Sequence, residues 1–356
     1  MSESPAANGA ASKNRLTVRA VLRTDVGKVR SENQDFATLT APEDEQAARL
    51  MLVADGMGGH RGGATASRLA AETVKEAFLT AGSGDVAEVL RTALMRANAK
   101  IWAEAQSNAE LRGMGTTTSA LVVRDGQGWF GHVGDSRIYL VRGGEIRQLT
   151  DDHSLVASMV REGLLTAQEA EHHPRRNVLQ RSMGVGEEVE IDVRGPMDLQ
   201  EGDTFVVCSD GLHGVVKEEE IREIVRLPLE RATEELVRLA LEKGAPDNVT
   251  VIVARVQGGS GVDPETTVLD AEDRALFDDT VRETPPQAER SRPPDSGQAE
   301  GAAEGAAEAA PAPQPERPLS IVKWTLIFVL LLGAAGGGIF WAQQQRFARQ
   351  AESSSR

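Results

Sequence analysis

The sequence predicts an α+β domain in which antiparallel β-sheets carry helices on their outer faces. Short apolar runs alternate with turn signals between residues 14 and 257, and longer stretches with helical spacing stand between some of them. Tight links such as "RDGQG" are typical of hairpins, which join antiparallel neighbours. A doubly wound parallel sheet would instead need a helix after nearly every strand.

Each strand is predicted from a run rich in β-branched and apolar residues that is bounded by turn residues. In chain order these runs cover residues 15–24, 48–55, 117–124, 128–134, 137–142, 188–194, 204–210 and 248–256. The stretch "VRGGEIRQL" indicates a further hairpin after residue 141.

Each helix is predicted from apolar residues spaced three or four apart. Two long helices are expected over residues 64–80 and 85–106, and a third over 229–243. Within 85–106 the residues Val86, Leu90, Leu94 and Ile101 share one face. A shorter pair is expected over 154–161 and 166–171.

Composition excludes some classes of partner. The chain has 356 residues, of which 40% are hydrophobic, so it can bury a sizeable core. Its net charge of −15 and its aromatic content of 4% argue against nucleic acid as a partner. The single cysteine, Cys208, excludes an intrachain disulfide, and its place in the apolar run "TFVVCSD" predicts a buried, reduced thiol.

Changes in composition divide the chain into five parts. Residues 1–13 have the composition of a disordered leader, and 14–257 form the predicted globular domain. Residues 258–317 contain 8 of the 15 prolines together with many Ala, Gly, Asp and Glu residues, which predicts an acidic linker. Residues 318–342 are the predicted membrane helix, and 343–356 a short tail.

The membrane helix is predicted from an uncharged stretch of 18 residues between Trp324 and Trp341. A helix of that length spans roughly 27 Å, close to the hydrocarbon core of a bilayer, and tryptophans favour the two interfaces. Because no N-terminal signal peptide precedes the domain, we expect a single-pass, tail-anchored membrane protein with its globular domain in the cytoplasm. Basic residues flank both sides of the stretch, so they do not decide the orientation.

Four aspartates stand at the margins of predicted strands. Asp55, Asp135 and Asp210 follow apolar runs, and Asp247 precedes one. An isolated carboxylate there would be costly to bury, whereas convergence on a hard cation such as Mg²⁺ or Mn²⁺ would offset that cost. Turn formation explains any one of these acids equally well, since Asp-Gly is a common turn opener, but it explains four together poorly.

Seven motifs then resemble, in order and spacing, the metal-dependent protein Ser/Thr phosphatases of the protein phosphatase 2C type in their bacterial form. They are "GKVRSENQD", "VADGMGGHRGG", "GMGTTTSAL", "HVGDSRIYLVR", "LTDDHSLV", "CSDGLHGVV" and "APDNVTVIV", and they cover roughly residues 15–257. The resemblance implies a β-sandwich of two antiparallel sheets flanked by helices, a four-layer αββα fold.

The resemblance also implies a ligand set for two or three Mn²⁺ or Mg²⁺ ions. Asp55 corresponds to the acid that bridges two metals, and the carbonyl of Gly56 to a ligand of one of them. Asp210 and Asp247 correspond to the remaining ligands of the first metal. Asp135 corresponds to a ligand of the third metal that bacterial members often show.

The reaction implied is hydrolysis of phosphoserine and phosphothreonine in proteins by in-line attack of a metal-bridging hydroxide. Arg30 resembles the arginine that binds the phosphate, and Asp35 the acid that holds metal-bound water. Residues 151–186 would form a flap beside the site. The expected partners are phosphorylated proteins, among them Ser/Thr kinases and their substrates, which the enzyme would oppose at the membrane.

One position departs from the pattern of many eukaryotic relatives. They carry a histidine two residues after the bridging acid, where this chain has Met57, and a thioether cannot donate a proton. His60 lies three residues further on and is not at the matching position. The alternative function is a non-catalytic pseudophosphatase that scaffolds a kinase. The presence of all four metal-site acids favours the enzyme.

Overall fold

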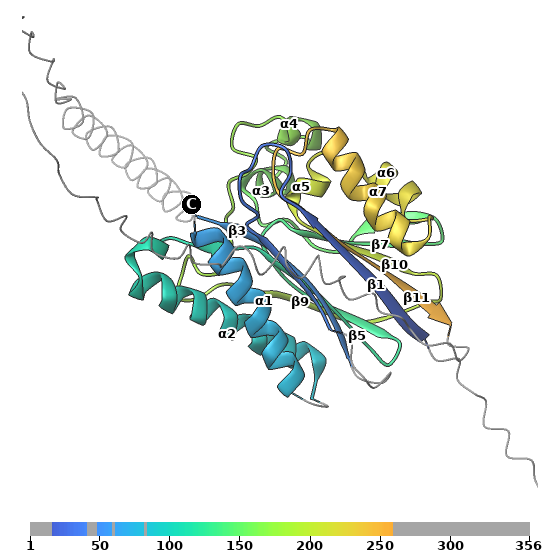
Figure 1. Ribbon diagram of the computed structural model, residues 1–356, viewed down its shortest axis with the longest axis horizontal. Helices are drawn as coiled ribbons and strands as arrows, with labels where there is room; N and C mark the ends of the chain where they lie inside the picture. Colours follow the sequence, from blue (N-terminus) through green and yellow to red (C-terminus); the bar gives the residue numbers. More distant parts are fainter. Residues whose placement is uncertain (1–15, 41–47, 59–60, 82–83, 259–356) are drawn as a thin grey trace, which may run out of the picture. The chain divides into compact units, whose positions relative to one another are not determined.

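The computed structural model describes residues 16–40, 48–58, 61–81 and 84–258, and within them the chain forms two antiparallel sheets packed face to face (Figure 1). The first sheet contains, in spatial order, β1 (Leu16–Asp25), β11 (Val249–Gly258), β10 (Thr204–Cys208), β7 (Arg137–Arg142) and β8 (Glu145–Gln148). The second contains β2 (Asp35–Leu39), β3 (Arg49–Met57), β5 (Thr118–Arg124), β6 (Gln127–Val133) and β9 (Asp192–Asp198), and β4 (Gly115–Thr116) pairs with β3.

Helices cover the outer face of each sheet. The second sheet is covered by α1 (Gly62–Thr80) and α2 (Val86–Ser107), which a short 3-10 turn (Ala109–Leu111) follows. The first sheet is covered by α5 (Asp210–His213), α6 (Glu218–Ile224) and α7 (Leu229–Glu242). Two further helices, α3 (Leu155–Arg161) and α4 (Ala167–Glu171), lie in the connection between β8 and β9.

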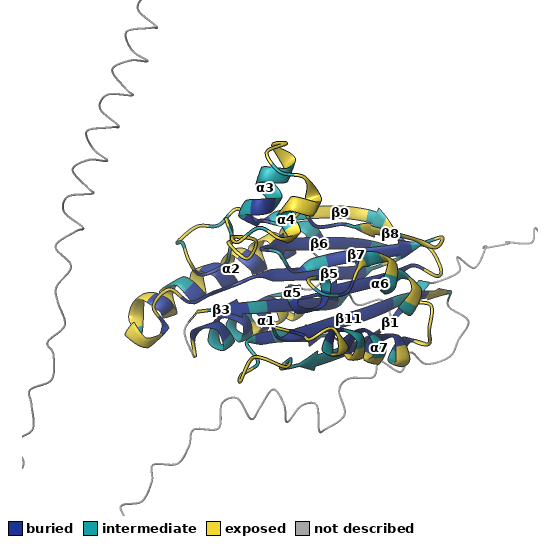
Figure 2. Ribbon diagram, turned by 90° about the horizontal axis from the view of Figure 1, so that it is seen from above, coloured by how far each residue is buried: buried dark blue, intermediate teal, exposed yellow. Residues whose placement is uncertain are grey.

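The central strands are apolar on both faces because each sheet has a core on either side. In β3, Leu50 and Leu52 face the helices α1 and α2, whereas Met51 and Val53 face the other sheet. Figure 2 shows the resulting buried interior, with exposed residues on α4 and along the edge strand β9. Three apolar layers between four layers of secondary structure confirm the predicted α+β sandwich.

Most predicted elements are present within one or two residues of their expected bounds. The short helix pair is confirmed, with the side chains of Ser154 and Thr166 capping α3 and α4. Strand β2 was missed because its five residues follow a polar stretch and give little periodic signal. The strand predicted over 188–194 is wrong at its start, since β9 begins at Asp192. Its partner β6 ends at Val133, so the residues before Asp192 have no strand to pair with.

Several predictions concern residues outside the described part of the chain. These are the leader 1–13, the linker from residue 259 on, the membrane helix 318–342 and the tail 343–356. Among the helices that the structure does describe, none is long and apolar enough to cross a membrane.

Candidate metal centre

Five aspartates from both sheets meet at one end of the sandwich. Asp35 opens β2 and stands opposite Asp55 of β3 in the strand register. Asp135 lies in the turn after β6, Asp210 is the first residue of α5 after β10, and Asp247 precedes β11. Each of the other four carboxylates acts electrostatically on Asp55. The structure therefore brings together the predicted site acids, although roughly 210 residues separate the first from the last.

Burial raises the pKa of most of these carboxyls, and mutual repulsion adds to the effect. The pKa of Asp35 rises to about 8, that of Asp135 to about 7, and that of Asp210 to about 6. The pKa of Asp55 is raised well above its ordinary value by burial first and then by Asp35 and Asp210. Such crowding disfavours the charged forms unless a cation or a proton compensates them.

Asp210 gives the clearest sign of a missing partner. Its Oδ1 atom is buried and has no hydrogen-bond partner, which is rare for a carboxylate oxygen and is expected of a metal ligand. The surrounding donors are carboxylate oxygens, the ligands that Mg²⁺ and Mn²⁺ accept. The residues thus fit divalent ions. In the side-chain positions of this structure, however, no three Asp, Glu, His or Cys residues of the described part of the chain are arranged to hold a metal ion.

One of the predicted metal ligands, Asp247, is paired with Arg30. The Arg30 Nη2 atom donates to Asp247 Oδ2 at 2.7 Å, and this hydrogen bond raises the pKa of Arg30. The Arg30 side chain is 53% exposed, so it can reach solvent or a ligand. Binding of an ion through that oxygen of Asp247 would require the pair to open. The predicted phosphate-binding arginine therefore lies at the metal-site acids.

Asn248 fixes this pair in place and was missed by the sequence analysis. It is buried, and its side-chain amide donates to the carbonyls of Val26 and Glu32 at 2.8 and 2.9 Å. Its Oδ1 accepts the N–H of Gln34 at 2.8 Å. The loop that carries Arg30 is thereby tied to the turn that carries Asp247. Only the position of Asn248 directly after Asp247 could have signalled this role.

Two hydroxyls join the strands that carry the acids. Thr117 Oγ1 accepts the N–H of Asp55 at 3.0 Å and lies 2.7 Å from Ser136 Oγ, next to Asp135. Ser209 Oγ donates to Asp35 Oδ2 at 2.7 Å, next to Asp210. Both hydroxyls are buried, and both lie inside the motifs that carried the family resemblance. Their roles depend on contacts across strands, which the motif letters do not specify.

The glycines beside the acids allow close packing of backbones. A Cβ atom on Gly56 would lie 2.1 Å from the Gly63 carbonyl oxygen, and one on Gly211 would lie 1.9 Å from the Asn248 carbonyl oxygen. The space beside Gly56 is thus filled by α1 and by the chain near Gln34. A side chain at Gly56 would therefore collide with backbone atoms.

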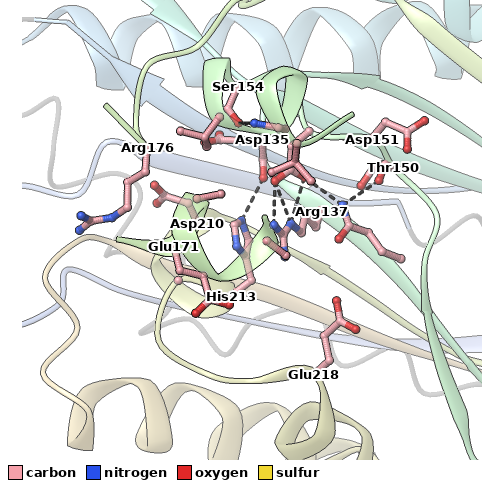
Figure 3. A pocket seen from close by; sticks show the side chains of 18 of the residues that line it. Asp135, Arg137, Thr150, Asp151, Ser154, Glu171, Arg176, Asp210, His213 and Glu218 are labelled. Atoms are coloured by element: carbon pink, nitrogen blue, oxygen red, sulfur yellow. Dashed lines mark hydrogen bonds and ion pairs between the residues drawn. The ribbon is translucent and has the colours of Figure 1, made fainter. Parts of the chain in front are cut away.

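A cavity of about 1030 Å³ lies beside Asp135 and Asp210, and Figure 3 shows these acids on its wall with Arg137 and His213. Residues of α3 and α4 line the same cavity, so the predicted flap segment 151–186 borders the site. Arg137 donates to both oxygens of Asp152 at the base of this segment, at 3.0 and 2.7 Å.

Of the two residues considered for proton donation, the structure describes Met57 but not His60. Met57 is the last residue of β3, next to the acids, and carries no titratable proton. His60 lies outside the described residues. Among the described histidines, His213 has its Nε2 atom 3.0 Å from the Asp135 carbonyl oxygen, and burial lowers its pKa to about 3. This histidine is therefore a neutral hydrogen-bonding partner of the backbone.

Comparison with known proteins gives a single, consistent result. A family model described as protein phosphatase 2C matches residues 28–247. The chain is 37% identical over 244 residues to the serine/threonine phosphatase stp of Listeria monocytogenes, covering 66% of this chain and 95% of that protein. It is 42% identical over 236 residues to the protein phosphatase PhpP of Streptococcus pneumoniae, covering 65% and 94%.

Solved structures agree. The serine/threonine phosphatase PstP/Ppp of Mycobacterium tuberculosis superposes with a TM-score of 0.61 at 37% identity, over 67% of this chain and 99% of that one. The catalytic domain of a PstP phosphatase, solved in complex with two manganese ions, gives a TM-score of 0.60 at 36% identity, over 68% and 99%.

Proposed function

The chain belongs to the protein phosphatase 2C family and is a Mn²⁺- or Mg²⁺-dependent protein serine/threonine phosphatase, and we propose that it hydrolyses its phosphoprotein substrates by in-line attack at the five-aspartate end of the sandwich. The observation that carries this proposal is the crowding of buried carboxyls around Asp55 together with the unpartnered Asp210 Oδ1.

The residues that would hold the ions are Asp55, Asp210 and Asp247, with the Gly56 carbonyl as a further oxygen ligand and Asp135 toward a third ion. When bound, the ions supply an activated water and neutralise charge on the phosphoryl oxygens.

The protein's own groups would orient the reaction. Arg30 stands half-exposed at the rim with its guanidinium already beside the acids, so it would clamp two phosphoryl oxygens once it leaves Asp247. Asp35, held by Ser209, would accept a hydrogen bond from a water in the site. Protonation of the leaving serine or threonine oxygen falls to a group other than Met57, and we assign it to solvent in the site.

Membrane tethering and opposition to Ser/Thr kinases rest on the sequence outside the described residues. The uncharged stretch Trp324–Trp341 would anchor the chain, and the acidic linker would let a cytoplasmic domain reach kinases at the same membrane. Modification of introduced, exposed cysteines by a membrane-impermeant maleimide in intact cells tests the orientation. Labelling of the catalytic domain without lysis would contradict a cytoplasmic location.

The decisive experiment measures phosphate release and metal binding on the same full-length protein in detergent. Phosphothreonine peptides and an autophosphorylated Ser/Thr kinase serve as substrates, with Mn²⁺, Mg²⁺ or chelator. We expect metal-dependent release that Asp210→Asn abolishes and that Asp125→Asn, a change in an exposed hairpin turn, leaves intact. Folded protein that binds the kinase and releases no phosphate with any metal would replace the enzyme by the scaffold alternative.

A further inference from the structure

The outward face of α2 is cationic, although the chain as a whole carries a net charge of −15. Arg91, Arg96 and Lys100 are all exposed, and no acid occurs between residues 89 and 103. Within the described part of the chain, none of these three side chains forms an ion pair or a hydrogen bond. Met95 lies among them and is 57% exposed, which is unusual for a large apolar side chain. These four residues, Arg91, Met95, Arg96 and Lys100, make up the α2 face.

The β5–β6 hairpin connects the end of the described chain with the beginning of α2. Gly258, the last residue of β11, pairs with Leu16 of β1. Gly126 in the β5–β6 hairpin lies close to Leu16, since a Cβ atom added to this glycine would be 3.8 Å from Leu16 Cδ1. From the same hairpin, Arg124 Nη1 donates to the carbonyl of Gly84 at 2.9 Å, and Gly84 stands two residues before α2. The described chain therefore ends on the side of the domain where the β5–β6 hairpin meets the beginning of α2.

That segment has the complementary composition. Residues 263–283, "DPETTVLDAEDRALFDDTVRE", contain eight acids and only two basic residues. Apolar residues recur among the acids at Val268, Leu269, Leu276 and Phe277. Only four residues, 259–262, separate it from Gly258. The remainder of the linker, by contrast, is rich in Ala, Gly and Pro and has few large apolar side chains.

We propose that residues 263–283 of this chain bind the α2 face, with their carboxylates against Arg91, Arg96 and Lys100 and their apolar side chains against Met95. The reach is sufficient, because α2 is about 33 Å long and 21 residues can span up to about 70 Å. The short connection keeps the segment at an effective concentration on the order of millimolar, so weak surface pairs suffice for binding.

The catalytic end stays open in this arrangement. β11 runs from the metal-site acids at its beginning to Gly258 at its end, so ten residues of strand separate the two. Binding at the α2 face would hold the first part of the linker against the domain and shorten the effective tether. Hydrolysis of a small aryl phosphate should be the same with the segment bound or displaced.

Cross-linking of the full chain in detergent tests the proposal, since Cys208 is fully buried and does not compete for reagent. A variant with Met95→Cys and Leu276→Cys is treated with a short bismaleimide. We expect a cross-link within one chain whose rate falls about threefold or more in Arg96→Glu/Lys100→Glu. It should fall similarly when salt is raised to 1 M, where the Debye length is about 3 Å. The control Arg147→Glu/Arg175→Glu, with the same charge change on β8 and beside α4, should leave it unchanged.

A charge swap separates binding from misfolding. Adding Asp270→Lys/Glu272→Lys/Asp273→Lys to the Arg96→Glu/Lys100→Glu variant should restore the cross-link, and circular dichroism should show the same fold throughout. A cross-link that ignores both sets of charges, or that forms only between two chains, would refute the proposal. So would hydrogen-exchange protection of α2 that requires anionic phosphatidylglycerol vesicles and survives neutralisation of the segment, because the partner would then be lipid.

Discussion

The hydroxyl of Thr117 lies 2.7 Å from the hydroxyl of Ser136, and this contact links the backbone of Asp55 to the turn that carries Asp135. The two acids belong to different parts of the predicted ligand set. Their relative position therefore depends on a pair of buried, uncharged hydroxyls.

We expect Thr117→Val to weaken metal binding and stability together. The isosteric side chain leaves the Asp55 N–H and the Ser136 hydroxyl without their buried partner, which costs about 1–3 kcal/mol of unfolding free energy. Ser136→Ala removes only the hydroxyl pair and should cost less. Urea unfolding and calorimetric titration with Mn²⁺ measure the two effects. Equal Mn²⁺ affinity in all three proteins would show that the contact does not position the acids.

Asp210→Asn should change stability in opposite directions with and without metal. When a chelator removes the metal, the variant should melt at a higher temperature than the natural protein. The substitution removes one of several crowded carboxylates, and with it the repulsion between that carboxylate and its neighbours. With saturating Mn²⁺ the order should reverse, because an ion bound to the folded state alone stabilises it by about 2.7 kcal/mol at a hundredfold excess over Kd. Thermal melts in both conditions provide the check, and a variant that melts lower in both would argue against crowding.

Arg30→Ala should lower kcat/KM for phosphopeptides while Mn²⁺ binds as tightly as before or more tightly. The variant loses a charge-assisted contact to phosphate, which we estimate at about ten- to a hundredfold in kcat/KM. It also frees Asp247 from its ion pair. Weaker Mn²⁺ binding in the variant would instead mean that Arg30 holds Asp247 in position for the ion.

Acid should destabilise the domain partly through His132. Burial lowers the pKa of this fully buried histidine to about 4, with His153 as the next contributor, whereas an unfolded chain titrates near 6.5. The unfolded state therefore binds more protons between these values. Stability from this group is complete above pH 6.5 and is lost as the pH falls toward 4, by about 3 kcal/mol in total.

The variant His132→Gln isolates that contribution. Its unfolding free energy should fall less steeply between pH 6.5 and 4 than that of the natural protein, whatever its starting value at pH 7. Urea unfolding at several pH values measures both slopes. Parallel slopes would show that another group governs the loss of stability in acid.

Sequence patterns predicted the fold well because periodicity is a local property. The continuous apolar run in residues 48–55 already indicated a strand, and the structure shows that its two faces serve two different cores. Short or irregular elements escaped, among them β2, since five residues carry too little periodic signal to stand out from a loop. The start of β9 was misplaced because the extent of its partner β6 cannot be seen in the run itself.

The candidate site was predictable to the level of its acids. Asp55, Asp135, Asp210 and Asp247 stood out by their place at strand margins, and Arg30 and Asp35 by resemblance to a family. Their individual roles stay predictions, to be tested as above. Asn248, Thr117 and Ser209 could not be chosen in advance, because a buried amide or hydroxyl is recognised by its partners.

The sequence by itself determined most of the strands, the long helices and which strand ends carry a carboxylate, since these follow from neighbours within a few residues. Only the tertiary structure decided that Arg30 meets Asp247, that Ser209 holds Asp35 and that Thr117 joins two acids. These contacts connect residues separated in the chain by as many as 217 positions. Their geometry is set when two twisted sheets pack together, which no local pattern of residues specifies.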